Sequence, residues 1–284
     1  MSAIAPPQAQ LAGSWAPAWG VWRRRLLIGL VVGYMAILIL GPVAALITGA
    51  LGRGIGPILT ALRDRQVLSA FWKTIGISII CVLVHAVFGT ALAWVLVRQR
   101  FPGRAILNAT LDLPFAISPV VAGYMLLLLF GRRGLFAPFL EQTGIRIAFA
   151  FPGMVIATLF VTLPFMVREL MPVLRAFGIE QEQAAATLGA SGWQTFRLVT
   201  FPALRHGFLY GITLTFARAL GEFGAVLVVS GGVQGRTETA TVYVFRALED
   251  RKYAGAYSAA LVLGLLSLIL VLTAEYLRNR DTKR

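Results

Sequence analysis

Six long apolar runs dominate the sequence and limit what the chain can fold into. A helix of about 20 apolar residues crosses the hydrocarbon core of a bilayer. Inside lipid, backbone N–H and C=O groups must find partners within the segment, and a helix provides them. We therefore expect an all-α integral membrane protein with six transmembrane helices. The expected spans are residues 26–51, 74–97, 111–130, 149–167, 207–231 and 253–277.

The composition agrees with a membrane protein. Hydrophobic residues make up 58% of the chain and charged residues 13%, whereas soluble domains hold about half and about a quarter. The formal net charge is +14, but the Lys and Arg residues are scattered between the apolar runs and form no continuous basic stripe. We therefore expect contact with membrane lipid and no binding to nucleic acid.

We expect three parts along the chain: a mobile N-terminal tail at 1–25, a transmembrane domain at 26–277 and a cytoplasmic tail at 278–284. The first apolar run is longer than the roughly 7 to 15 residues of a signal-peptide core, which favours a spanning helix over a cleaved leader. Six spans place both termini on one side of the membrane. A weak excess of Lys and Arg on that side favours the cytoplasm.

A polar, alanine-rich segment at 178–204 interrupts the apolar runs. Glu180 and Glu182 favour the positive end of a helix, and the alanines that follow have high helix propensity. Gly189 is of the residue type that ends helices in the left-handed conformation. The pattern predicts a short helix followed by a hinge at Gly189.

A second short helix is predicted after the hinge. Ser191 followed three residues later by Gln194 matches a capping box. The helix carries the large apolar Trp193, and Pro202 is expected to end it. Two interpretations fit such a unit outside the membrane: an amphipathic connector that rests on lipid, or a protruding element that inserts into a groove on a partner.

The spacing of this segment resembles the cytoplasmic loop signature of ABC importer permeases. The signature runs Glu-Ala-Ala, three residues, Gly, nine residues, a branched aliphatic residue, one residue, and an apolar residue before Pro. The corresponding residues here are Gln183, Ala184, Ala185, Gly189, Val199, Phe201 and Pro202. Gln183 replaces the leading acid, although Glu182 stands next to it. The resemblance implies a cytoplasmic coupling loop, with Ser191 and Trp193 inside it, that docks into a cleft of a separate ATP-binding subunit.

No nucleotide-binding motif accompanies the loop. A P-loop reads G-x-x-x-x-G-K-[ST], because its amides cradle the phosphates and its lysine reaches them. No lysine of this chain follows a glycine, and the stretch GGVQGRT at 231–237 has Arg in place of Lys and one residue too few. We therefore expect no ATPase site and no cofactor in this chain, with ATP and Mg²⁺ bound by the partner ATPase.

Residues suited to catalysis or metal binding are sparse. Cys81 and His85 are four residues apart and share a helix face, but no carboxylates stand near them in the sequence to complete a metal site. We interpret this pair as packed core. The chain has only two histidines, His85 and His206, and they do not supply a convincing site. The sequence thus predicts no catalytic residue and no metal site, which disfavours a membrane-embedded enzyme.

The fifth run contains two opposite charges four residues apart, Arg218 and Glu222. Charges at membrane depth usually face a bundle interior or a water-filled cavity. One interpretation is an ion pair that neutralises itself within one helical turn. The other is that Arg218 lines or supports an anion path, with Gly221 and Gly224 allowing bending at a gate. Both can hold together.

The third run holds Pro114 and Pro119. These prolines are expected to break regular hydrogen bonding around Ser118, either as an ordinary kink or as a discontinuous helix that lines a cavity. Ser118 and Pro119 are therefore candidates for the translocation path. Asp112 suits the positive end of the helix that follows it.

Loops expected on the outer face carry basic residues that could attract an anion. These residues are Arg132, Arg133, Arg236 and Arg246. Solvated loop charges are the alternative interpretation, and their reach at physiological ionic strength is only about 8 Å.

Further stretches resemble the sulfate and thiosulfate branch of the ABC importer permeases, particularly its second membrane subunit, within the sulfate and molybdate permease superfamily. The likeness covers about 23–277. It rests on DLPFAISPVVAG, FGRRGLF, FAFPGMVIATLFVTLPFMVREL, TLGASGWQTF and ARALGEFGAVLVVSGG. The resemblance implies a type I importer fold in the bacterial inner membrane, with the coupling loop between helices 4 and 5.

The same resemblance implies import of sulfate or thiosulfate. The implied partners are a related permease in a heterodimer, two copies of an ABC ATPase, and a periplasmic or extracellular sulfate-binding protein. Molybdate and tungstate permeases share the loop and the GEFGA pattern, so these anions are an alternative cargo. A secondary anion transporter is an alternative of another class, but it has no use for a coupling loop and usually shows an internal repeat.

Overall fold

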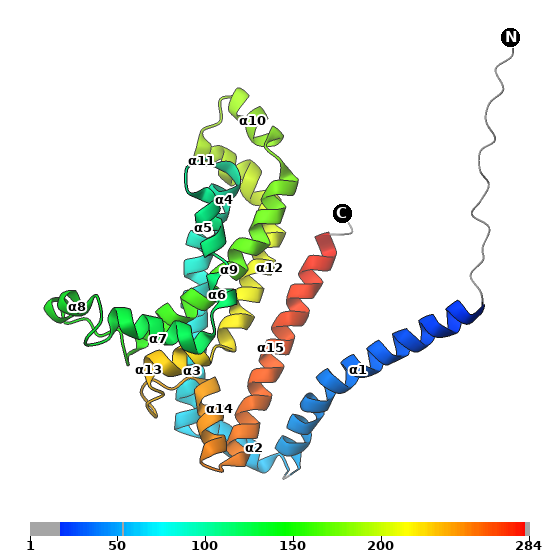
Figure 1. The fold of residues 1–284 in the computed structure, drawn as a ribbon, viewed down its shortest axis with the longest axis vertical. Coiled ribbons are helices and arrows are strands. Elements are labelled where there is room, and N and C mark those ends of the chain that lie inside the picture. The colour runs from blue at the N-terminus through cyan, green and yellow to red at the C-terminus, as the bar shows by residue number, and fades with distance from the viewer. Residues whose placement is uncertain (1–17, 53, 282–284) are drawn as a thin grey trace. The chain divides into compact units, whose positions relative to one another are not determined.

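The computed structural model describes residues 18–52 and 54–281, which form helices joined by short connections, with no strand among them (Figure 1). This agrees with the all-α expectation. The elements, with η marking π-helical segments, are α1 (Ala18–Leu51), α2 (Gly56–Arg63), α3 (Arg65–Val84), η1 (His85–Gly89), α4 (Thr90–Arg98), α5 (Arg104–Thr110), α6 (Leu113–Ala116), α7 (Pro119–Phe130), α8 (Ala137–Thr143), α9 (Phe151–Phe177), α10 (Glu180–Thr187), α11 (Gly192–Thr195), η2 (Phe196–Thr200), α12 (Phe201–Leu220), α13 (Gly224–Ser230), α14 (Ala240–Glu249) and α15 (Tyr253–Asp281).

The first helix, α1, is uninterrupted, and its apolar stretch Trp22–Leu51 is long enough to span a bilayer. It begins at Ala18, ahead of residue 26, where the first span was expected. Most of the expected N-terminal tail, 1–17, and the last residues of the C-terminal tail, 282–284, lie outside the described residues. The chain from Ala50 onward forms a separate unit, which contains every site considered below.

Four helical runs among the described residues are long and apolar enough to cross a membrane, and up to six spans result if each of two bent pairs counts as one. The count of six therefore stays a prediction. Besides α1, the unbroken runs are Arg65–Arg98, Phe151–Phe177 and Tyr253–Tyr276. The first of these begins well before residue 74, because Asp64 caps its first turn by accepting a hydrogen bond from the N–H of Gln66 (2.8 Å).

The third expected span is broken. Arg104–Ala116 and Pro119–Phe130 meet at 115°. Both residues at the break are extended, with ψ of 131° at Ile117 and 135° at Ser118. A residue before proline is driven out of the α region by the proline ring, which accounts for the extended Ser118. The expected break around Ser118 is confirmed, and it is far sharper than an ordinary kink.

The fifth expected span is also bent. Gly192–Leu220 and Gly224–Ser230 meet at 55°. The second segment, α13, is short and lies against α7 and α9 at the end of the body opposite α10 and α11 (Figure 1). Both bent pairs thus place their short segments in the same part of the body.

Two long helices, α9 and α12, run side by side through the body, with α3, α4 and α15 packed on them (Figure 1). The segment α10 to α11 connects them at one end. At 1.5 Å per residue, the 27 residues of α9 extend about 40 Å, so this end lies a full membrane thickness from the start of α9.

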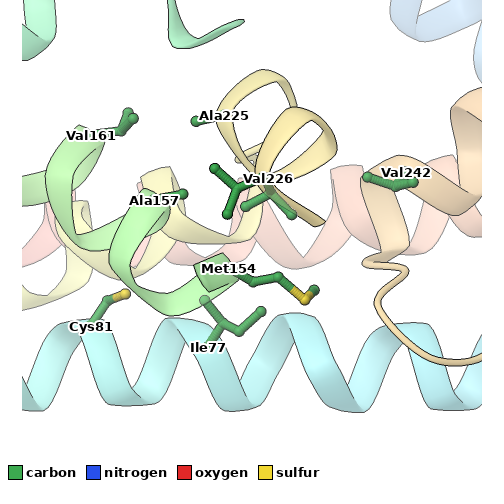
Figure 2. Packing of buried hydrophobic residues seen from close by; sticks show 9 residues of the cluster. Ile77, Cys81, Met154, Ala157, Val161, Ala225, Val226 and Val242 are labelled. Atoms are coloured by element: carbon green, nitrogen blue, oxygen red, sulfur yellow. The ribbon is translucent and has the colours of Figure 1, made fainter. Parts of the chain in front are cut away.

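Three apolar clusters hold the body together, and one of them joins α3, α14 and α15. The one around the bent pairs joins α3, α9, α13 and α14, and Figure 2 shows its side chains converging between these helices. Its members are Ile77, Cys81, Met154, Ala157, Val161, Ala225, Val226, Val229 and Val242. The second cluster lies nearer α10 and joins α4, α9 and α12. Its members are Ala93, Leu96, Leu111, Met166, Val167, Leu170, Met171, Leu174 and Leu204.

The contact of α7 with α13 requires a small residue at Gly123. A Cβ there would lie 2.7 Å from the carbonyl oxygen of Ala225 and 2.9 Å from the Cβ of Val228. The Gly123→Ala variant should therefore lower the apparent unfolding temperature in detergent, with an overpacking cost of about 1–3 kcal/mol. Gly76→Ala is the matched control. Gly76 is also inside a helix, but with open space around it, so alanine should be neutral or stabilise by up to about 1 kcal/mol. Equal unfolding temperatures for the two variants would contradict the close packing.

Candidate functional site

The segment predicted as the coupling loop forms a helix, a hinge and a second helix. Helix α10 ends before Gly189, whose φ of +81° lies in the left-handed region that favours glycine. The capping box that begins α11 is complete. The Gln194 N–H donates to the Ser191 hydroxyl (3.3 Å), and the Ser191 N–H donates to the Gln194 side-chain oxygen (2.8 Å). The local prediction is confirmed.

The prediction that Pro202 ends the second helix was wrong. Helix α11, the π-helical η2 and α12 form one continuous run, Gly192–Leu220. Pro202 lies inside this continuous run, as the second residue of α12. The π-helical η2 just before it shifts the backbone hydrogen bonds by one residue, since the Phe201 N–H bonds to the carbonyl of Phe196, and this shift lets the helix continue past a proline. The loop is therefore joined rigidly to a membrane helix.

The loop exposes large apolar side chains. Leu188 at the hinge is 89% exposed, Trp193 on α11 is 68% exposed and Leu198 is 70% exposed. Gln183 and Ala184 are also exposed, and Ala185 is half-buried. Trp193 stacks on Phe196 with ring centroids 5.7 Å apart. Exposed apolar side chains on a rigid, polar-flanked protrusion are typical of a protein-docking surface.

Arg98, the last residue of α4, fixes this loop to the body. Its Nε lies 2.9 Å from a carboxylate oxygen of Glu182, and its side chain is only 8% exposed. It also donates to the carbonyl oxygens of Leu174 (3.1 Å) and Gly178 (2.5 Å) at the end of α9. The sequence analysis missed Arg98. The only signal was a basic residue at the end of an apolar run, which is ordinary for a membrane helix.

The intramembrane ion pair is present. A guanidinium nitrogen of Arg218 lies 2.8 Å from a carboxylate oxygen of Glu222, and the side chains are 29% and 2% exposed. The other carboxylate oxygen of Glu222 accepts the N–H of Ala225 (3.1 Å), so it caps the first turn of α13. The Thr241 hydroxyl donates to the Glu222 carbonyl (2.7 Å). Glu222 thus joins α12, α13 and α14 across the bend, which supports the neutralisation interpretation.

The two glycines near this pair have different surroundings. Gly221, at the bend, has φ of −88°, and a Cβ there would meet nothing closer than 3.8 Å, so the geometry does not require glycine. A Cβ on Gly224 would lie 3.1 Å from the Cβ of Pro119. Gly224 is therefore a close-packing point between the two bent pairs, and its expected role in bending stays a prediction. The structure brings Pro119 and Gly224 together, while Ser118 is exposed beside them.

Asp112 is held by an arginine rather than by a helix end. It stands at the N-cap of α6 but makes no capping hydrogen bond. Its carboxylate instead accepts two bonds from Arg168 of α9, at 2.9 and 2.7 Å. The same guanidinium donates to the side chain and the backbone of Asn108, both at 2.9 Å. Asp112 thus lies at a helix start, as expected, and a bidentate ion pair that was not expected fixes the bent third span to α9.

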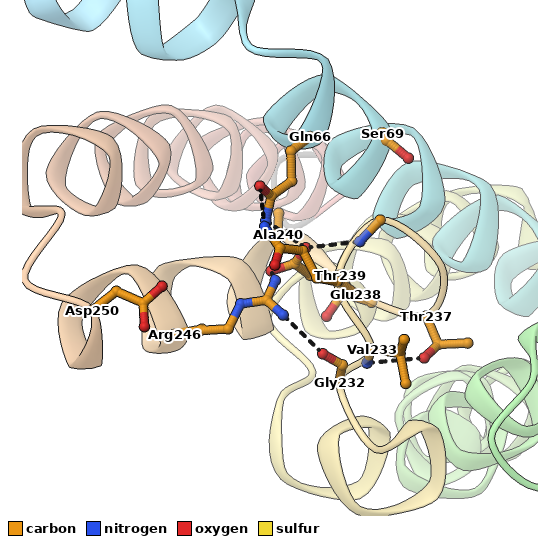
Figure 3. Close-up of polar contacts among 12 residues, drawn as sticks. Gln66, Ser69, Gly232, Val233, Thr237, Glu238, Thr239, Ala240, Arg246 and Asp250 are labelled. Atoms are coloured by element: carbon orange, nitrogen blue, oxygen red, sulfur yellow. Dashed lines mark hydrogen bonds and ion pairs between the residues drawn. The ribbon is translucent and has the colours of Figure 1, made fainter.

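A buried carboxylate that the sequence analysis missed lies in the loop between α13 and α14. Glu238 has a side chain only 1% exposed, and it pairs with Arg246 of α14. It also accepts hydrogen bonds from Gln66 of α3 (3.0 Å) and from the N–H of Gly235 (3.4 Å). Figure 3 shows Gln66 and Arg246 pointing toward it from different helices. The expectation that Arg246 attracts an anion is therefore corrected, because its charge is already neutralised within the chain.

Other basic residues of the same end line a cavity of about 690 Å³. Arg132, Arg146 and Arg236 contribute to its wall together with Glu141, whereas Arg133 does not. All of these side chains are exposed. The cavity also includes Phe149 and Ala150, just before α9 begins, so it lies at the end of α9 opposite the coupling loop. Its charges make it suited to an acidic group.

Cys81 and His85 belong to the packed interior, as predicted. The thiol is fully buried in the apolar cluster, and the His85 Nε2 lies 3.0 Å from the Thr162 hydroxyl. Within the described residues no three His, Cys, Asp or Glu side chains gather as a metal site would require. The coupling loop and the ion pairs therefore remain the candidate functional residues.

The ion pair can be tested by a double-variant comparison. Arg218→Gln leaves the buried Glu222 carboxylate without a counter-ion, and we expect a loss of about 2 kcal/mol. Loss of a partner from a fully buried pair costs roughly 3–5 kcal/mol, and Arg218 is 29% exposed. Adding Glu222→Gln should restore more than half of this loss, because the amide oxygen can still cap α13. Thermal unfolding in detergent measures both. Absence of recovery would contradict the neutralisation interpretation.

Residues 85–280, which contain Arg98, the coupling loop and the Arg218–Glu222 pair, match the family described as "Binding-protein-dependent transport system inner membrane component". The chain is 47% identical over 255 residues to the sulfate transport system permease protein CysW of Synechocystis sp., covering 90% of this chain and 92% of the relative. It is 34% identical over 259 residues to the sulfate transport system permease protein CysT of Escherichia coli, covering 91% and 94%.

Among solved structures, the chain is similar to a bacterial alginate ABC transporter in complex with an alginate pentasaccharide-bound periplasmic protein. The TM-score is 0.75 at 18% sequence identity, covering 94% of this chain and 98% of that chain. This likeness shows the fold of an ABC importer permease. With the family model covering more than half of the sequence, the chain belongs to the family of binding-protein-dependent transport system inner membrane components.

Proposed function

We propose that this chain is a membrane-spanning permease subunit of an ATP-driven importer that carries sulfate and thiosulfate across a bacterial inner membrane. Relatives named as sulfate transport system permeases align with about nine tenths of the chain, and identity is higher to CysW than to CysT. The observation that carries the proposal is the rigid, apolar-tipped coupling loop in a chain whose sequence has no P-loop.

The coupling loop supplies the site for a separate ATPase. Leu188 and Trp193 are exposed at its tip, and an apolar helical protrusion of this kind fits a groove on a partner. In this proposal two copies of the ATPase bind ATP and Mg²⁺, one copy per permease subunit. The loop and both chain termini then lie in the cytoplasm, and the chain itself holds no cofactor.

A related permease completes the pathway. The CysW and CysT relatives are both sulfate transport system permeases, and this chain aligns with nearly all of each. We propose a heterodimer in which this chain takes the CysW-like place. Movement of the ATPase would displace the coupling loop and, through the continuous run Gly192–Leu220, the bend beside Arg218. Because Arg218 keeps 29% of its side chain exposed, its free edge can face an anion path.

The opposite end of the body would receive a soluble sulfate-binding protein. The solved relative was captured with a periplasmic protein. The arginine-lined cavity offers three exposed guanidinium groups against one carboxylate, which favours an acidic surface as its partner. A sulfate-loaded binding protein that docks there would release its anion near the bent pairs.

Sulfate uptake with a loop variant tests the main proposal. Cells that lack their own system should regain uptake of labelled sulfate when this chain is expressed with its partner permease, ATPase and binding protein. Leu188→Ser should abolish ATPase co-purification and reduce uptake at least tenfold, because burying one leucine side chain contributes about 1.5–3 kcal/mol. Leu135→Ser changes an exposed leucine that belongs neither to the loop nor to the residues lining the cavity, so it is the matched control and should change neither.

Excess thiosulfate should inhibit this uptake, and molybdate should inhibit it less. Restored uptake of molybdate without sulfate would overturn the proposed cargo and leave the permease role intact. Unchanged ATPase co-purification in Leu188→Ser would contradict the docking role of the loop.

Charge reversal tests the outer partner. Arg132→Glu should slow association of the sulfate-loaded binding protein with the reconstituted complex by roughly tenfold at low salt, because an attractive charge in the cavity becomes repulsive. The effect should shrink at high salt as the charges are screened. Arg133→Glu changes the neighbouring charge outside the cavity and should have a much smaller effect. Equal effects of the two reversals would contradict a specific role for the cavity.

A further inference from the structure

Glu182 is an acid of the coupling loop that faces the body rather than a partner. Its side chain is 17% exposed, whereas the neighbouring Gln183 is fully on the surface. One carboxylate oxygen lies 2.9 Å from the Nε of Arg98. The other accepts bonds from the Arg98 Nη2 (3.2 Å) and from the Thr200 hydroxyl (2.9 Å). Both oxygens are therefore engaged within the chain, in charge-assisted bonds that are stronger than neutral ones.

Arg98 extends this contact to the end of α9. The carbonyls of Leu174 and Gly178, which accept its other bonds, belong to the last turn and the C-cap of that helix. A helix end leaves such carbonyls without partners inside the helix, so the guanidinium both satisfies them and complements the negative end of the helix dipole. The Arg98–Glu182 clamp, defined by these two residues, thus joins the ends of α4 and α9 to α10, and through Thr200 to η2.

The Arg98–Glu182 clamp spans Gly178, the residue about which the backbone between α9 and α10 could rotate. Gly178, between α9 and α10, has φ of +71°, which glycine adopts without strain and which permits large backbone changes. Arg98 bonds to the carbonyl of Leu174, which precedes Gly178, to the carbonyl of Gly178 itself, and to the carboxylate of Glu182, which follows it. A force applied at the tip of the loop therefore reaches α4, α9 and α12 together instead of being absorbed by rotation at Gly178.

We infer that Arg98 and Glu182 are positioning residues for energy coupling, which brace the coupling loop so that displacement by the ATPase moves the membrane helices. The inference rests on the proposed function. It adds that the acid of this loop acts within the chain, and that binding of the ATPase and transmission of its motion depend on different residues. Leu188 and Trp193 face outward for binding, while Arg98 and Glu182 face inward for transmission.

The test compares binding, stability and coupling in one reconstituted complex of this chain with its partner permease, ATPase and sulfate-binding protein. Glu182→Gln keeps the shape of the side chain and an acceptor for Thr200, but removes the charge that Arg98 holds. We expect ATPase co-purification at the wild-type level and continued ATP hydrolysis. Sulfate transported per ATP hydrolysed should fall at least about fivefold, the lower range of measured coupling between sites. Glu180→Gln, the same change at an exposed position of α10, should match the wild type.

A distance measurement separates bracing from simple stabilisation. Spin labels at Thr187→Cys on α10 and Ala176→Cys on α9 report the angle across Gly178, and Cys81 is fully buried and so protected from labelling. In the complex, Glu182→Gln should broaden the distance distribution, whereas a role limited to stability would lower the unfolding temperature and leave the distribution narrow.

If Glu182→Gln fails to assemble, Arg98→Met combined with Glu182→Met replaces the pair by apolar groups, an exchange that buried ion pairs often tolerate. The double variant should assemble and show the same loss of coupling. Wild-type transport per ATP in either assembled variant, with a narrow distance distribution, would overturn the inference and leave the proposed function standing. Failure of the wild-type complex to import sulfate would instead overturn the proposed function.

Discussion

In a bilayer each backbone or charged group needs a partner inside the protein, and this requirement is most demanding where two helices break within the apolar region. The third and fifth runs bend by 115° and 55°, which leaves backbone groups without helical partners. The short segments that follow the two bends pack on each other through Gly123 and Gly224. Glu222 then caps α13, and Arg218 neutralises Glu222. The packing of α7 on α13 is therefore the point at which α9, α12 and α14 also meet.

The same requirement explains how the two ends of the body are connected. Helices α9 and α12 run from the coupling loop to the broken segments, and their facing side chains form the cluster that includes Met166, Leu170 and Leu204. Packed cores transmit displacement because they deform little. A loop fixed to α9 by Arg98 and continuous with α12 is therefore mechanically linked to the bend beside Arg218. Dense packing between polar anchors at both ends would be the physical basis of the proposed coupling.

The sequence predicted what depends on local pattern. Apolar length predicted the helical spans, Gly189 and the Ser191–Gln194 box predicted the loop, and spacing by four predicted the Arg218–Glu222 pair. Contacts between distant segments were not predictable, because nothing in the sequence pairs Arg98 with Glu182, and Glu238 looks like any loop acid until its burial is seen.

One local expectation was wrong because tertiary structure overrode it. Pro202 was expected to end a helix, but the π-helical turn before it lets the helix continue. Asp112 stands at a helix start as expected, but its two bonds to Arg168 could not be foreseen. The sharp break at Ser118 was foreseeable from the two prolines, whereas the direction of the chain after it depends on the docking of α7 against α13.

The distribution of paired and unpaired arginines bears on how an anion would be handled. Arg98, Arg168, Arg218 and Arg246 each form an ion pair with an acid of the same chain. A paired guanidinium attracts a distant anion weakly, since its field is cancelled beyond a few ångströms and screened by salt. The exposed arginines of the cavity are therefore better suited to attract a distant anion. Of the four paired arginines, Arg218 is the one beside the bend of the fifth run. An anion that approaches its free edge would compete with Glu222, and such competition loosens the cap of α13. In the proposed function, passage of a dianion and movement at this bend would thereby be linked through a single carboxylate.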